Sequence, residues 1–152
     1  MKLLVFLLFP ILVIGAVLFL SFDHQEQVKV DQHGLTDKQN EQINALGKLE
    51  PNQATILEFS QNEALMEAAR NLFISQCASC HGTKGNGGTG PNLTDNEHIL
   101  VKEVPDIYDV INNGSIAKGM PPWKGLLSQT KLILLSSYVV KIQEQSPEEP
   151  SD

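Results

Sequence analysis

The chain has 152 residues, 18 of them acidic and 11 basic, and a net charge of −7 at neutral pH. This balance disfavours a nucleic-acid partner, because phosphate backbones bind basic surfaces. The length supports one small domain, and two cysteines are too few for a disulfide framework.

The first 22 residues predict a membrane anchor. No charge interrupts the run from Leu3 to Phe22, and twenty helical residues reach about 30 Å, the thickness of a bilayer core. A cleaved signal peptide is the alternative, but bulky residues stand before Asp23, where its cleavage site needs small ones. Lys2 before the run and Asp23 after it put the amino terminus inside. We therefore expect a single-pass anchor in the cytoplasmic membrane, with the remaining chain on the periplasmic or extracytoplasmic side.

The polar stretch from residue 23 to residue 59 predicts a linker with weak helical segments around Gln39–Leu49 and Gln53–Phe59. Ser60-Gln61-Asn62-Glu63 reads as a capping box, so we expect the folded domain to span residues 60–143. Residues 144–152 predict an acidic, disordered tail.

Three apolar patterns with helical spacing follow within the domain. The first ends at the cysteine motif, the second runs from Pro105 to Asn113-Gly114, and the third is capped by Ser128. No alternating strand pattern stands out, so we predict an all-α fold. The side chains expected to face inward are Leu65, Met66, Ala69, Leu72, Phe73, Ile107, Val110, Ile111, Leu132, Leu135, Tyr138, Val139 and Ile142.

The motif Cys77-Ala78-Ser79-Cys80-His81 predicts covalent attachment of a haem. Each thiol can add across a vinyl group of the porphyrin, and His81 then reaches the iron as an axial ligand. Because this motif uses both cysteines, we expect one haem c per chain. Structural zinc is the first alternative, but it needs four ligands and the chain has no third cysteine. A redox dithiol is the second, but it should follow a strand and open a helix, whereas Cys77 closes one.

Met120 is the expected second iron ligand. It lies in Gly119-Met120-Pro121-Pro122-Trp123, where glycine and proline hold an extended loop, and His98 is the alternative. A thioether ligand favours Fe(II) and closes the sixth position to oxygen and peroxide. These properties suit an electron carrier rather than an enzyme. If the methionine were displaced, a haem-based peroxidase or gas sensor would be the alternative function.

Residues 63–142 resemble class I cytochromes c. The resemblance rests on the cysteine motif, on Phe73 and Tyr138 in the first and last helices, and on the segment Gly90 to Leu93. It implies that the Pro91 carbonyl accepts a hydrogen bond from His81 and that Leu93 packs against the porphyrin. We expect Trp123 to line the pocket or to bond a propionate through its indole nitrogen.

Residues 81–95 and 119–128 are also similar to the haem-c domains of membrane-anchored subunits in cbb-type haem–copper oxidases. This resemblance implies a respiratory electron carrier whose donor is a quinol-oxidising complex or another cytochrome and whose acceptor is a terminal oxidase. Such subunits often carry two haem domains and two membrane helices, and this chain has one of each. Whether it is an electron-entry subunit of the oxidase or a tethered donor stays open.

Three lysines are expected near the exposed haem edge, namely Lys84, Lys118 and Lys124. They would suit a redox partner with acidic residues around its own cofactor, and a purely solubilising role explains them equally well.

Overall fold

Helices form the regular structure of the computed structural model, which describes residues 29–95 and 101–146. Isolated bridges are the only β structure within these ranges. The predicted all-helical domain is therefore confirmed. In chain order the helices are α2 (Asp37–Ala45), α3 (Gln53–Ser60), α4 (Glu63–Gln76), α5 (Ala78–His81), α6 (Val104–Asn113), the 3₁₀ helix η1 (Ile116–Lys118) and α7 (Gln129–Glu144).

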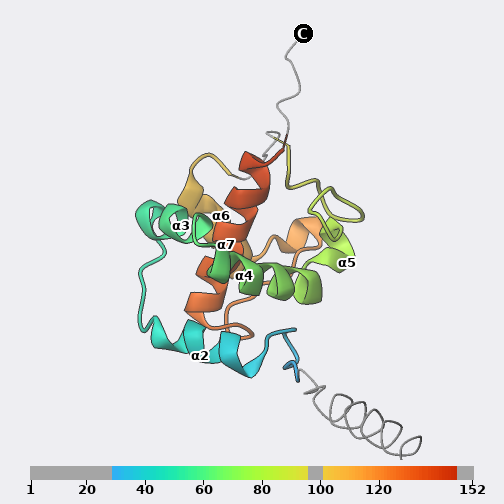
Figure 1. Ribbon diagram of the computed structural model, residues 1–152. Helices are drawn as coiled ribbons and strands as arrows, with labels where there is room; N and C mark the ends of the chain where they lie inside the picture. The colour runs from blue at the N-terminus through green and yellow to red at the C-terminus, as the bar shows by residue number, and fades with distance from the viewer. Residues whose placement is uncertain (1–28, 96–100, 147–152) are drawn as a thin grey trace, which may run out of the picture.

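Helix α7 runs through the middle of the domain, and α4 crosses it (Figure 1). Every residue from Leu132 to Val140 is buried, because other helices cover α7 on several sides. At the crossing, the rings of Phe73 and Tyr138 lie 5.1 Å apart between centroids. Ala69 is completely buried on α4, where a larger side chain would force the two helices apart.

The stretch that we expected to be a polar linker contributes to the core over its described part. Leu35, Ile43, Ile56 and Phe59 are all buried in the same cluster as the side chains of α4 and α7. Helices α2 and α3 both pack against α7, and α3 also contacts α4. The structure thus moves the start of the folded domain from the expected Ser60 to about residue 30, since burial of these apolar side chains outweighs the polar composition of the segment.

Capping residues set most helix ends where the sequence predicted them. Ser128 accepts a hydrogen bond from the Lys131 amide at the start of α7, and α6 has proline in its first turn and ends at Gly114. The expected capping box at Ser60 is wrong. Asn62 caps α4 instead, because its side chain accepts a hydrogen bond from the Leu65 amide.

Several expectations fall on residues outside the described ranges: the membrane anchor (1–22), the alternative ligand His98 and most of the acidic tail (144–152). Within residues 29–95 and 101–146, no helix has both the length and the apolar character needed to span a bilayer.

Asp31 fastens the segment before α2 to the domain. One carboxylate oxygen accepts hydrogen bonds from the amides of His33 and Leu35, and the other accepts one from the Asn40 side chain at 3.0 Å. Lys131 at the start of α7 lies 3.6 Å from the same carboxylate. Burial opposes the charge of Asp31, but these hydrogen bonds and the lysine outweigh it and lower its pKa from 3.8 to about 2.

Replacing Asp31 with asparagine is expected to destabilise the folded chain by about 1–2 kcal/mol at pH 7, because the buried amides and Lys131 lose a charged partner. A carboxylate with a lowered pKa stabilises the fold above the pKa of the unfolded chain, and this contribution disappears as the pH falls from about 4 to about 2. Denaturant unfolding at several pH values measures both effects. Glu41→Gln, an exposed change on α2, is the control and should alter stability by less than about 0.5 kcal/mol. Equal acid sensitivity in Asp31→Asn and the unmodified chain would contradict the role given to Asp31.

Candidate haem site

The cysteine motif lies at a sharp junction between two helices. Cys77 ends α4 and starts the single turn of α5, and its carbonyl accepts hydrogen bonds from the amides of Cys80 and His81. Cys77 is half-buried, Cys80 is exposed, and both are free thiols. A helical turn therefore presents both thiols and the imidazole beside one another, as the motif requires.

Burial, and then the neighbouring Cys80, raise the pKa of Cys77 from 9.0 to about 12. Cys77 is therefore a neutral thiol at physiological pH. Reactive redox cysteines show the opposite shift, toward the thiolate. The environment of Cys77 thus disfavours the dithiol alternative.

His81 is held by a hydrogen bond from its Nδ1 to the carbonyl of Pro91, at 2.9 Å. A carbonyl can only accept, so Nδ1 carries a proton, and in the neutral ring Nε2 then keeps a free lone pair. This is the tautomer that a metal-ligating imidazole needs, and the second-sphere bond fixes the orientation of the ring.

The glycine-rich loop from Gly82 to Gly90 folds back on the motif. The Gly87 amide donates to the His81 carbonyl at 2.8 Å, and the Gly90 amide donates to the Cys80 carbonyl at 2.9 Å. A Cβ atom at Gly90 would come within 3.0 Å of the His81 ring. Glycine is required there because the loop passes directly against the imidazole, which brings Pro91 within reach of Nδ1.

Backbone hydrogen bonds hold the loop carrying Met120 at two points. Ser115 and Met120 exchange two backbone hydrogen bonds of 2.8 and 3.1 Å around η1. The Trp123 amide then donates to the Ile111 carbonyl at the end of α6. The prolines between them add stiffness, so the loop offers the Met120 thioether from a fixed backbone.

All these segments border one cavity of about 670 Å³, which lies within the usual range for small-molecule sites. Each of the seven residues singled out by the sequence lies on its wall: Cys77, Cys80, His81, Pro91, Leu93, Met120 and Trp123. Lys118 also borders it. Lys84, which we expected beside it, lines a separate cavity instead.

Other wall residues were not named as site residues from the sequence. The apolar ones are Phe73, Val101, Ile107, Val110, Ile111, Leu135 and Val139. All of these except Val101 had been assigned to the inward faces of helices, so the periodicity indicated burial without indicating that a cofactor would be the neighbour. Gln76 and Gln143 are polar wall residues that carried no sequence signal.

The donors fit a haem c. Two free cysteines for thioether bonds, an imidazole with a free Nε2 and a thioether border the same cavity, whose remaining wall is largely apolar. Soft sulfur and imidazole donors are the axial ligands of c-type cytochromes, and an apolar wall suits a porphyrin.

Comparisons with known proteins agree with this site. Residues 64–139, half of the chain, match the family described as cytochrome C oxidase, cbb3-type, subunit III. "Cytochrome c55X" of Paracoccus denitrificans (strain Pd 1222) is 30% identical over 82 residues, which cover 54% of this chain and 79% of that protein. The "Cbb3-type cytochrome c oxidase subunit FixP" of Sinorhizobium medicae (strain WSM419) is 29% identical over 94 residues, with 56% of this chain and 32% of that protein covered.

Among solved structures, the crystal structure of cytochrome CL from the marine methylotrophic bacterium Methylophaga aminisulfidivorans MPT has a TM-score of 0.50. It is 20% identical, and the match covers 72% of this chain and 70% of that chain, so the likeness concerns the fold alone. The family match and the c55X relative carry the assignment. The chain belongs to the family of cbb3-type cytochrome c oxidase subunit III and has the helical fold of a class I cytochrome c.

Proposed function

We propose that the chain is a membrane-anchored monohaem cytochrome c that carries single electrons in a respiratory chain. The observation that supports this most directly is the arrangement around His81. Its Nδ1 is tied to Pro91, its Nε2 is left for a metal, and the Met120 loop borders the same cavity. Haem, when bound, supplies an iron that alternates between Fe(II) and Fe(III).

The residues on the cavity wall have different roles in holding the haem. Cys77 and Cys80 attach it covalently, and because they are the only cysteines the chain holds one haem. His81 and Met120 would hold the iron of the bound group, and Pro91 orients His81 through its carbonyl. The further wall residues Leu93 and Trp123 pack against the group, the latter with its indole nitrogen available to a propionate.

Such a protein needs no general acid or base, because neither a proton nor a chemical group moves. A braced loop and an imidazole held by a second-sphere bond keep the ligands in place when the charge on the iron changes. With both His81 and Met120 holding the iron, no position would remain for oxygen or peroxide. The same ligand pair raises the reduction potential relative to two histidines.

We further propose that the acceptor is a terminal haem–copper oxidase and that the donor is a quinol-oxidising complex or another cytochrome. The names of the FixP and CcoP relatives support the acceptor, although the chain spans only about a third of their length. Near the Met120 loop, Lys118 borders the cavity and Ile116 is 72% exposed. An apolar residue beside a cation suits a partner with an acidic rim.

The folded segment before α4 shortens the chain that links the haem domain to the proposed membrane anchor. Because Val30 pairs with Thr36 and Asp31 pairs with Lys131 of α7, only residues 23–29 separate this folded segment from the apolar run that ends at Phe22. Seven residues span at most about 25 Å. A haem domain on so short a tether stays close to the bilayer, which favours a fixed oxidase subunit over a donor with long reach.

Purification of the full chain from solubilised membranes tests the proposal. We expect one covalent haem per chain by mass, a reduced spectrum that carbon monoxide leaves unchanged, and oxidase subunits among the co-purifying proteins. A large spectral shift with carbon monoxide would instead support the peroxidase or sensor function. A carrier-type spectrum without any oxidase subunit would refute only the assignment of the acceptor.

A further inference from the structure

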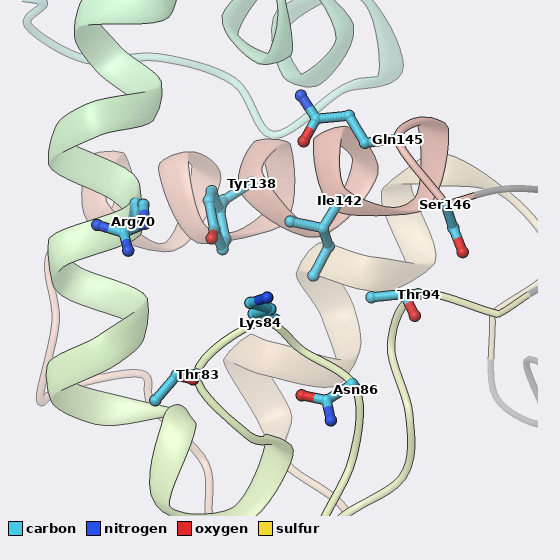
Figure 2. A pocket seen from close by; sticks show the side chains of 9 residues that line it. All are labelled: Arg70, Thr83, Lys84, Asn86, Thr94, Tyr138, Ile142, Gln145 and Ser146. Atoms are coloured by element: carbon cyan, nitrogen blue, oxygen red, sulfur yellow. The ribbon is translucent and has the colours of Figure 1, made fainter.

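A second cavity, of about 450 Å³, lies between α4, the loop after His81 and the last turn of α7. Its wall shares no residue with that of the haem cavity. Figure 2 shows its side chains, with Arg70 at one end, Lys84 below Tyr138 in the middle, and Thr94 and Ser146 at the other end. The proposed electron carrier makes no use of this space.

The charge of the second cavity is positive. Arg70 and Lys84 are its only ionised wall residues, and no carboxylate borders it in the part of the chain that the structure describes. The ion pairs found within that part, Lys131–Asp31 and Lys141–Glu63, involve neither of these two cations. Two cations that face one hollow without an acidic neighbour repel each other, and an anion placed between them would relieve that repulsion.

Neutral hydrogen-bond donors surround the two cations. The side chains of Thr83, Asn86, Gln145 and Ser146 border the cavity. The hydroxyl of Tyr138 does so as well, and burial raises its pKa although Arg70 acts in the opposite direction. Tyr138 therefore stays protonated at neutral pH and can donate.

This combination selects among anions. A guanidinium offers paired donors in a plane, and an ammonium adds a point charge, so together with hydroxyls they match the several oxygens of a phosphate group. The volume exceeds what a bare oxyanion needs, which leaves space for the molecule that carries the phosphate. We propose that the second cavity binds a phosphate group between Arg70 and Lys84, presented either by a soluble phosphorylated molecule or by a phospholipid headgroup.

Calorimetric titration of the haem-loaded full chain in neutral detergent tests this site. One arm uses inorganic pyrophosphate, and the other compares short-chain phosphatidylglycerol with short-chain phosphatidylcholine at the same ionic strength. We expect saturable binding at one site in at least one arm, weakening as salt is raised. Pyrophosphate binding alone identifies a soluble ligand, and selective phosphatidylglycerol binding alone identifies a headgroup. The full chain includes the acidic residues that follow Ser146 in the sequence. The measured affinity therefore includes any competition between these residues and the added anion for Arg70 and Lys84.

The double variant Arg70→Gln/Lys84→Gln should weaken binding at least tenfold, since each cation contributes a charge-assisted hydrogen bond. Both side chains are exposed, so the fold should be unaffected. Lys48→Gln removes one exposed charge outside both cavities and should leave the affinity within twofold. The proposal is overturned if neither probe binds saturably, or if the double variant binds as the unmodified chain does.

Discussion

Replacing Met120 with alanine is expected to abolish the methionine-to-iron absorption at the red end of the oxidised spectrum and to let carbon monoxide bind the reduced protein. The loop bearing Met120 is braced by Ser115 and Trp123, so removal of the thioether leaves an open position rather than a rearranged loop. Loss of the ligand that favours Fe(II) should lower the reduction potential by at least about 60 mV, the equivalent of a tenfold change for one electron. Visible spectroscopy and a redox titration measure these effects.

Met66 provides the matched control. It is buried on α4 and does not border the haem cavity. Met66→Leu should therefore keep the absorption band and the resistance to carbon monoxide, at a cost in stability below about 1.5 kcal/mol. Survival of the band in Met120→Ala would exclude Met120 as the sixth ligand, whereas absence of the band from the unmodified protein would direct attention to His98.

Substitution of Gly114 by alanine is expected to destabilise the protein strongly and to loosen iron ligation by Met120. Gly114 ends α6 with φ +70°, and a Cβ atom there would lie 2.5 Å from the Pro122 nitrogen and 2.7 Å from the Met120 carbonyl oxygen. These are backbone atoms of the braced loop, so the loop itself must move. We expect about 1–3 kcal/mol from the positive-φ, extended-ψ conformation and a further 1–3 kcal/mol from the overlap.

Gly125 separates the two contributions, because it has φ +84° and nothing within 4 Å of an added Cβ atom. Gly125→Ala should therefore show only the conformational cost, with an unchanged methionine band. Denaturant unfolding and the oxidised spectrum of both variants make the comparison. If Gly114→Ala and Gly125→Ala lost equal stability and kept the same spectrum, the contact between α6 and the Met120 loop would have no influence on the iron site.

Helix ends, which depend on neighbouring residues, were predicted from the sequence more successfully than contacts between distant segments. Ser128 at the start of α7 and Gly114 after α6 were predicted because a cap depends on a few neighbouring residues. The error at residues 29–59 arose because their average polarity is high, while a few apolar side chains at suitable spacing are buried. The sequence of α7 does indicate that further helices must pack against it. Its run from Leu132 to Leu135 is apolar throughout, and such a helix needs covering on more than one face.

The sequence by itself determined the chemical groups of the candidate haem site: two thiols and an imidazole within five residues, and a methionine in a loop that contains glycine and two prolines. These features depend on residue type and short spacing, which any fold of the chain retains. Only the tertiary structure decided that the seven singled-out residues border one cavity, that α2 and α3 complete the core, and that Lys84 faces a different hollow from Lys118. Those arrangements follow from packing between segments far apart in the chain, where burial of apolar surface outweighs local preference.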